Sequence, residues 1–325
     1  MGEVLIKIKK VGVCGSDMHL FRDGRIGEIV IDSPFVLGHE CMGEVVEVGK
    51  DVKRGLIGSR VAIEPAFFCG KCRWCKSGNT NVCPDIRFLG LPPTSGALQE
   101  YLVHPAHLVE SLPDTISDGA AVVLEPLAVA LHAINLMKIR SGHRIVILGT
   151  GVIGTCVLSL LRLYKGVHII CVDLLQDRLE RAKKMDADSV VHIQKDDKDA
   201  VPRILDVLDG LGADIVFECA GAEETIWNMC EIAAPGGHIA VVGTNPNNSI
   251  AFSSGTSRRK GLTIRCVRRS LNTLPSCIEL TAKGFISPDS LVTHTFDLSQ
   301  IDTAFATVER YEDGVLKALI NMEKE

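Results

Sequence analysis

The chain has few aromatic residues, no excess of basic charge and no continuous apolar run at its amino terminus. Its formal net charge of −5 and pI near 6.1 give no reason to expect nucleic acid or an acidic membrane surface as a partner. The first residues, MGEVLIKIKKVGVCG, alternate apolar and basic side chains like a half-buried strand. We therefore expect no secretory signal and a cytoplasmic location.

The sequence also lacks an internal repeat and a low-complexity linker. Its 325 residues, 46% hydrophobic and 23% charged, are typical of a soluble globular protein and exceed what one hydrophobic core usually supports, so two domains are expected. An uncharged stretch at 145–161, IVILGTGVIGTCVLSLL, approaches the lower length limit of a membrane span. Its glycines indicate a buried strand, a turn and a helix instead.

Disulfide bonds are not expected among the twelve cysteines, because cytosolic thiols are kept reduced. The segment FCGKCRWCKSGNTNVC at 68–83 has the spacing Cys-x2-Cys-x2-Cys-x7-Cys, which lets a short loop turn four thiolates toward one tetrahedral centre. Four sulfur donors leave no position open for substrate, so the pattern predicts a structural zinc held by Cys69, Cys72, Cys75 and Cys83. Spacing alone also permits an iron–sulfur cluster or unliganded loop cysteines.

Most of the other cysteines stand singly in apolar stretches. Small thiol side chains in such places are usually buried and inert. We expect burial of Cys41, Cys156, Cys171, Cys219, Cys230, Cys266 and Cys277.

A second set of metal-binding residue types lies upstream and downstream of the cysteine cluster. VGVCGSDMHL at 11–20 and VLGHECMGEVVEVG at 36–49 supply Cys14, His39 and Glu40, and LEPLAVALHA places Glu125 in an otherwise apolar segment. Each residue alone would be ordinary. Together they match the three protein donors of a catalytic zinc, whose fourth position takes water or substrate.

These stretches, with PFVLGHE, RVAIEP, GTGVIG and SLVTHTF, resemble the zinc-dependent medium-chain dehydrogenases, and among them the sorbitol (L-iditol) dehydrogenase branch. The resemblance implies Cys14, His39 and Glu40 as ligands of the catalytic zinc, with Glu125 beside it as a ligand or through bound water. It implies a mostly β, GroES-like catalytic domain that carries the structural zinc lobe. Members normally have further strands before GEVLIKIKKVG, so we expect either a shortened start, which could weaken the domain or its activity, or an edge that is covered in another way.

The same resemblance assigns roles in catalysis and substrate binding. Ser16 would take the substrate proton and His19 would pass it toward solvent; otherwise Ser16 is a turn residue and His19 a packing histidine. Glu125 and Arg269 would hold substrate hydroxyls, and Phe88 would be a further residue in contact with the substrate.

A dinucleotide-binding pattern begins at residue 143. HRIVILGTGVIGTCVLSLLRLYKGVHIICVD has Gly149, Gly151 and Gly154 between an apolar run and a helix-compatible segment, which permits close approach of a pyrophosphate to the helix amino terminus. Asp173 lies nineteen residues beyond Gly154, close to the usual spacing of about 20 for the carboxylate that binds the ribose. A carboxylate there repels a 2'-phosphate, so NAD is expected over NADP. Arg178 accompanies NAD in the resembling family and is otherwise an exposed helix residue.

Further apolar runs alternate with helical segments at 197–209 and 223–233, which predicts an α/β fold with a doubly wound parallel sheet. We expect a Rossmann cofactor domain at 131–271, inserted in a catalytic domain formed by 1–130 and 272–325. Ligands bind at the carboxyl edge of such sheets. The candidate cofactor contacts are therefore Val152, Ile153, Val242, Gly243, Thr244, Val267 and Arg268, with the glycines, Asp173 and Arg178.

The expected activity is zinc-dependent hydride transfer between a polyol and NAD, in either direction. Leu20 stands where the branch usually has tyrosine, and Arg268 where it often has phenylalanine, so the substrate is open. SRRKG at 257–261 with Arg268 would suit a sugar or polyol phosphate, and threonine and 2,3-butanediol dehydrogenases share the zinc and glycine motifs. A non-catalytic dinucleotide-binding descendant is the remaining alternative. Relatives suggest a dimer or tetramer.

Overall fold

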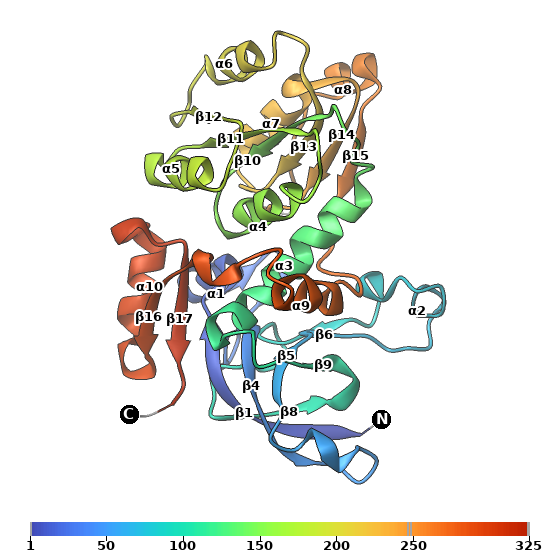
Figure 1. The fold of residues 1–325 in the computed structure, drawn as a ribbon, viewed down its shortest axis with the longest axis vertical. Helices are drawn as coiled ribbons and strands as arrows, with labels where there is room; N and C mark the ends of the chain where they lie inside the picture. Colours follow the sequence, from blue (N-terminus) through green and yellow to red (C-terminus); the bar gives the residue numbers. More distant parts are fainter. Residues whose placement is uncertain (1, 246, 248, 324–325) are drawn as a thin grey trace. The chain divides into compact units, whose positions relative to one another are not determined.

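The computed structural model describes residues 2–245, 247 and 249–323, and the chain divides into two compact units (Figure 1). Unit 1 comprises Met1–Ala128 and Ser270–Glu325, and unit 2 comprises Val129–Arg269. Unit 2 is therefore inserted in the sequence of unit 1, and helix α3 (Asp118–Leu136) begins in unit 1 and ends in unit 2.

Unit 1 is built on a seven-stranded sheet in which strands from both ends of the chain are paired. The order is β16-β17-β1-β4-β5-β9, and β8 also pairs with β1. Only β16 and β17 are parallel; the other pairs are antiparallel. The strands are β1 (Glu3–Gly12), β4 (Glu40–Val48), β5 (Arg60–Ile63), β8 (Tyr101–Pro105), β9 (Val109–Ser111), β16 (Val292–Asp297) and β17 (Lys317–Asn321).

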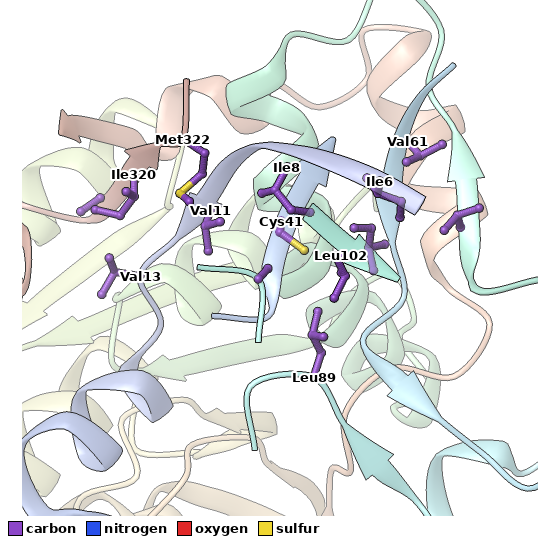
Figure 2. Packing of buried hydrophobic residues seen from close by; sticks show 14 of the residues in the cluster. Ile6, Ile8, Val11, Val13, Cys41, Val61, Leu89, Leu102, Ile320 and Met322 are labelled. Carbon is purple, nitrogen blue, oxygen red and sulfur yellow. The ribbon is translucent and has the colours of Figure 1, made fainter. Parts of the chain in front are cut away.

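Strand β1 organises the core of unit 1 through its alternating side chains. Val4, Ile6 and Ile8 are buried while the residues between them are more exposed, as a strand with a period of two residues requires. Figure 2 shows Ile6 and Ile8 in the same cluster as Leu102 and Ile320, so side chains from three strands, β1, β8 and β17, pack together. Burying each such side chain stabilises the fold by roughly 1.5–3 kcal/mol.

Shorter elements complete unit 1 around this sheet. Two two-stranded pairs, β2 with β3 and β6 with β7, lie outside it. The elements are α1 (Gly15–Asp23), β2 (Arg25–Ile26), β3 (Ile29–Val30), β6 (Ala66–Phe67), α2 (Arg73–Lys76), β7 (Arg87–Phe88), α9 (Leu274–Ala282) and α10 (Ile301–Arg310), with 3-10 turns at Arg54–Leu56, Thr80–Val82, Ala106–Leu108, Pro288–Leu291, Leu298–Gln300 and Glu312–Gly314.

Unit 2 contains the predicted doubly wound parallel sheet, and the α/β fold class is confirmed. The strand order is β12-β11-β10-β13-β14-β15, with every pair parallel. Figure 1 shows α4 and α5 on one face of the sheet and α6 and α7 on the other. The elements are β10 (Arg144–Leu148), α4 (Val152–Leu161), β11 (His168–Asp173), α5 (Gln176–Lys184), β12 (Ser189–His192), α6 (Ala200–Val207), β13 (Ala213–Glu218), α7 (Glu223–Ile232), β14 (Ala233–Val241), α8 (Ser254–Lys260) and β15 (Thr263–Cys266).

The central strands of unit 2 are apolar on both sides because helices cover both faces. In β10, residues 145–148 are fully buried, and the stretch 145–161 forms a strand, a turn and a helix as predicted. Among the described residues, α3 is long and apolar enough to cross a membrane by length and composition. Since 67% of its most apolar window is buried, α3 is only weak evidence for a membrane span.

Burial of the single cysteines was predicted correctly for five of the seven: Cys41, Cys156, Cys171, Cys230 and Cys277. The prediction was wrong for Cys266, which is exposed, and Cys219 is only half-buried. Cys266 ends β15, which is an edge strand with a neighbour on one side only. An apolar run at a sheet edge does not guarantee burial.

Candidate metal centres and cofactor site

The four clustered cysteines form one compact group in a loop between β6 and β7. These strands pair Ala66 with Phe88 and Phe67 with Arg87, which closes the base of the loop. The four sulfur atoms lie within 4.8 Å of one another, and all four thiols are free. Such a set matches tetrahedral coordination by sulfur with no open position, as predicted for a structural zinc.

Backbone N–H groups point at the sulfurs of this loop. The amide of Cys72 donates to Cys69 Sγ at 3.4 Å, and that of Cys75 donates to Cys72 Sγ at 3.4 Å. Hydrogen bonds from the backbone of Lys71 and Cys72 lower the pKa of Cys69 to about 7, whereas burial and the neighbouring thiols raise that of Cys75 to about 12. The loop by itself therefore favours a thiolate at Cys69 and disfavours one at Cys75, and the charge of a zinc ion would allow all four sulfurs to ionise.

Cys14, His39 and Glu40 form the second group, and their ligand atoms also lie within 4.8 Å of one another. Cys14 is the N-cap of α1, two residues after the end of β1, and Glu40 is the first residue of β4. Strand pairing sets Gly12 opposite Glu40, which brings the two segments together. His39 and Glu40 are buried, whereas Cys14 is half-buried and keeps some contact with solvent. One thiol, one imidazole and one carboxylate suit a zinc with an open position.

Asp17 connects two members of this group and was missed from the sequence. Its buried carboxylate accepts hydrogen bonds from the backbone N–H of Cys14 at 3.0 Å and of Gly38 at 3.2 Å. Asp17 Oδ1 also lies 3.5 Å from His39 Nδ1, which leaves Nε2 for a metal. Burial raises the pKa of Asp17, but His39 and the backbone donors outweigh burial and hold it below its usual value. The signal was an acid at the third position of a helix that begins after a candidate ligand.

Lys317, in β17, was also missed. Its ammonium is paired with Glu40 Oε2 and donates to the carbonyl of Val13 at 3.0 Å. Burial lowers the pKa of Lys317, but Glu40 and then Cys14 outweigh burial and raise it above its usual value. The available signal was a lone lysine within the apolar run VLKALIN.

Glu125 and Phe88 lie in unit 1 with this group. Glu125 is not one of the three clustered donors, yet its pKa responds to their charges: burial raises it to about 7, with Glu40 and Glu64 adding to the rise and His39 and Lys317 opposing it. The Phe88 ring contacts that of His39, with centroids 5.2 Å apart. Phe88 therefore shields the imidazole, whereas contact of either residue with substrate stays a prediction.

Ser16 and His19 lie on α1, three residues apart and hence on one helix face. Both are half-buried, and His19 Nδ1 lies 3.8 Å from Asp23 Oδ2. A hydroxyl beside Cys14 and an imidazole one turn further on have the spacing of a proton path, although this role stays a prediction.

In unit 2, the glycine motif forms the turn between β10 and α4. Gly149 has φ 88°, Gly151 is the N-cap of α4, and a Cβ on Gly154 would lie 1.9 Å from the carbonyl oxygen of Gly149. The turn therefore has room for backbone alone, and Val152 and Ile153 form the first turn of the helix. A turn of this shape suits a pyrophosphate, and its contact with the cofactor stays a prediction.

Asp173 ends β11, beside that turn. Its Oδ2 accepts hydrogen bonds from the backbone N–H of Thr150 at 2.7 Å and from its hydroxyl at 3.0 Å, and Oδ1 accepts from Leu175 N at 2.9 Å. Arg178 Nη1 lies 3.9 Å from Asp173 Oδ2. Asp173 thus holds the glycine turn in shape, and its contact with a ribose stays a prediction.

The other predicted cofactor residues follow β14 and β15 at the carboxyl edge of the same sheet: Val242, Gly243, Thr244, Val267 and Arg268. Glu218 supports this edge and was missed from the sequence. It ends β13, is fully buried, and accepts hydrogen bonds from Ala220 N, Gly221 N and Thr225 Oγ1. Burial raises the pKa of Glu218, although those donors oppose the rise.

Arg269 is the last residue of unit 2 and has φ 54°, and its contact with substrate stays a prediction.

A cavity of about 650 Å³ opens among the loops after β12 and β14 and the start of α7. It is lined by apolar groups, including Ile193 and Trp227, and by the acids Asp196, Asp197, Glu223 and Glu224. It lies at the edge of the sheet where doubly wound folds bind ligands.

Two family models match the chain, one within unit 1 and one mainly within unit 2. Residues 1–114 match the alcohol dehydrogenase GroES-like domain, and residues 152–283 match the zinc-binding dehydrogenases. The chain belongs to the zinc-dependent medium-chain dehydrogenases, in the sorbitol dehydrogenase branch, which confirms the predicted family, the oxidoreductase class and zinc as a cofactor.

Individual relatives span almost the whole chain. The sorbitol dehydrogenase of Bacillus subtilis is 36% identical over 98% of this chain and 90% of its own length. An Escherichia coli oxidoreductase/dehydrogenase of unknown specificity, involved in membrane biogenesis, has a solved structure with TM-score 0.91 and 37% identity, covering 99% of this chain and 92% of that one. An alcohol dehydrogenase of E. coli CFT073, solved in complex with NADH, has TM-score 0.90 and 28% identity over 98% of this chain and 92% of its own.

Proposed function

We propose that this enzyme oxidises a secondary hydroxyl of a polyol with NAD, and runs the reverse reduction as well. The observation that carries the proposal is the group of Cys14, His39 and Glu40, three buried or half-buried donors of mixed type in a chain of the sorbitol dehydrogenase branch. A zinc bound there would stabilise the developing alkoxide while NAD accepts the hydride.

The chain's own residues would prepare the substrate for this transfer. Phe88 shields His39 from solvent on one side of the ring, and Asp17 fixes the imidazole from another. Glu125, with a pKa raised by burial, would hold a neighbouring hydroxyl or the metal-bound water, and Arg269 would bind a further hydroxyl. Hydrogen-bonding groups in an apolar surrounding are what a polyol requires, since each unpaired hydroxyl would otherwise oppose binding.

Ser16 would accept the hydroxyl proton and His19 would pass it toward solvent. Their spacing on α1 supports this order, with Cys14 directly before the helix. Removing a positioned proton acceptor typically costs about 10²-fold or more in rate.

NAD is proposed over NADP because two sets of carboxylates disfavour an extra phosphate. Asp173 lies beside the glycine turn, and the cavity at the carboxyl edge of unit 2 has four acids in its lining, Asp196, Asp197, Glu223 and Glu224, against one lysine, Lys198. The bound cofactors of related structures do not decide this choice, since one relative is solved with NADH and another with NADP. We further propose that residues 131–271 form the cofactor domain, that residues 1–130 and 272–325 form the catalytic domain, and that the protein acts in the cytoplasm as a dimer or tetramer.

The experiment follows NADH formation from NAD, and NADPH formation from NADP, with sorbitol, xylitol, galactitol, threonine, 2,3-butanediol and a polyol phosphate. We expect turnover of one or more free polyols with NAD, and loss of turnover when zinc is chelated. Ser16→Ala should lower kcat by about 10²-fold, whereas the control Ser33→Ala, at an exposed serine, should not. Turnover of threonine or of the phosphate alone would contradict the polyol assignment, and NADH binding without turnover would favour a non-catalytic descendant.

A further inference from the structure

The carboxylate of Glu40 has an unusual neighbour for a candidate metal ligand. Lys317 is the only lysine or arginine among the buried residues of the described chain, and its ammonium contacts Glu40 Oε2. Glu40 and Lys317 are each about 1% exposed, so both charges are removed from water together. A buried ammonium is costly unless its partner is close, which makes this pair a specific feature of the site.

Three neighbouring strands fix the geometry of the pair. In the sheet, β1 lies between β4 and β17, and Gly12 of β1 is opposite Glu40 on one side and Leu319 on the other. A Cβ at Gly12 would lie 2.4 Å from Glu40 Oε2, so this glycine gives the carboxylate room. Val13 O accepts a second hydrogen bond from Lys317 Nζ at 3.0 Å. Oε2 is therefore held by the ammonium, and a metal bound beside Cys14 and His39 would share the same carboxylate with Lys317.

We propose that Lys317 is a built-in counter-ion of the metal site, which compensates Glu40 when no metal is bound and so keeps the donor set assembled and its metal exchangeable. The proposal rests on the proposed metal-dependent function. A single buried carboxylate can be compensated by the ammonium or by a divalent cation, and the two cations repel each other across it. Lys317 therefore stabilises the metal-free chain and weakens metal binding. Either cation, the ammonium or the metal, reduces the need for the other to compensate the charge of Glu40.

The four-cysteine group offers the internal contrast. The cations near it, Lys71, Arg73 and Lys76, are all exposed, where solvent screens their charge. The sulfurs of that loop have no buried ammonium among the described residues to replace the metal. The metal at Cys14, His39 and Glu40 should therefore leave and return without unfolding, while the metal of the cysteine group should not.

The test compares Lys317→Met and Lys317→Gln with Lys317→Arg, which keeps the charge. Lys9→Met is the matched control, because Lys9 forms more exposed ion pairs from β1 with Glu44 and Glu323. Two properties are measured: thermal unfolding with and without added zinc, and affinity of the selectively metal-stripped protein for zinc and cobalt, by chelator competition and the visible spectrum of cobalt.

In the metal-free state we expect the Met and Gln variants to unfold well below the parent, and added zinc to raise their unfolding temperature more than it raises that of the parent. Their zinc affinity at this site should be about tenfold tighter, with a shifted cobalt spectrum. Lys317→Arg and Lys9→Met should match the parent. Equal zinc stabilisation of parent and variants, a weaker affinity in the variants, or variants that fail to fold even with zinc would each overturn the proposal.

Neither measurement uses a substrate or NAD. An incorrect polyol assignment would thus leave this test intact. A parent protein that binds zinc only at the four cysteines would instead remove the proposed function itself.

Discussion

The two candidate metal centres of unit 1 differ in how the chain builds them. Cys69, Cys72, Cys75 and Cys83 come from one short loop, and their nearest supports are the loop's own backbone N–H groups. Cys14, His39 and Glu40 come from the ends of separate strands, and their supports are the buried charges of Asp17 and Lys317.

This difference separates a metal that holds a fold from a metal that takes part in a reaction. Four sulfurs fill the coordination sphere, so the metal would stabilise the conformation of the loop at 69–83 and leave no coordination position for a substrate. Three mixed donors leave one position open, and the surrounding fold must then hold the donors in place without the metal's help.

The largest expected effect is at the open centre. His39→Ala should lower kcat by about 10³-fold or more and remove one zinc per chain, because it deletes a ligand from a three-donor set. The thermal stability of the lobe should be unchanged. Metal analysis with steady-state kinetics checks this, with His168→Ala in unit 2 as the control. Retention of both zincs by His39→Ala would contradict the assignment of His39 as a ligand of the open centre.

The matching change in the lobe should act on stability instead. Cys72→Ser should remove the other zinc and lower the unfolding temperature by about 5 °C or more, because a loop stabilised by metal loses its main constraint. Cleavage by a protease within 69–83 should accelerate, while kcat of the folded fraction changes less than about tenfold. Cys277→Ser, at a buried cysteine outside both groups, is the control. A loss of kcat as large as that of His39→Ala, with the fold intact, is the contradictory result.

Asp17→Asn should weaken zinc binding at the open centre by about 10- to 100-fold, because the amide no longer orients and polarises His39. Zinc binding at the four cysteines should stay as it is. Chelator competition measures both affinities in one sample. Asp23→Asn is the control, because it changes the net charge by the same amount at the end of the same helix, away from the metal site. Equal losses in both variants would show that charge alone, rather than position, matters.

The smallest expected effect concerns how the free energy of unfolding depends on pH through a buried histidine that packs against β6. His104, in β8, is fully buried, contacts the carbonyl of Glu64 at 3.1 Å and packs edge-on against Phe67 of β6. Burial lowers its pKa to about 4, while the Glu64 carbonyl opposes the shift. The unfolded chain therefore binds a proton near its ordinary pKa of about 6.5 before the folded chain does, so stability falls as pH drops through this window.

Between about pH 7 and about pH 5 this histidine should cost about 2 kcal/mol of unfolding free energy. His104→Gln should remove that part of the pH dependence, measured as the difference between urea unfolding curves of parent and variant. Exposed His192 provides the control substitution, His192→Gln. Parallel pH profiles for parent and His104→Gln would contradict the assignment.

The sequence predicted the cysteine group more completely than the open centre, and the reason is physical. Local spacing alone identified the cysteine group, because its donors and its backbone supports lie within residues 68–83. The open centre's donors could be proposed from their residue types and a family resemblance, but Lys317 is 277 residues from Glu40 and only strand pairing brings them together. Spacing carries no information on such pairings.

The same limit explains the outcome for unit 2. The parallel sheet and the glycine turn follow from apolar runs and the motif itself, and both were predicted correctly. The hydrogen bonds of Asp173 with Thr150, and the support that Glu218 gives to the neighbouring loop, depend on which strand ends are adjacent. Cys266 was misjudged for a related reason, since a sequence pattern does not say which strand is at the edge.

The most direct test of the account is graded chelation of the native protein with zinc content and polyol oxidation measured on the same samples. We predict that activity falls in step with loss of the first zinc per chain, while the second remains bound and the protein stays folded, and that added zinc restores activity. Full activity after loss of the first zinc, or simultaneous loss of both zincs with unfolding, would contradict the division into an open and a closed metal centre.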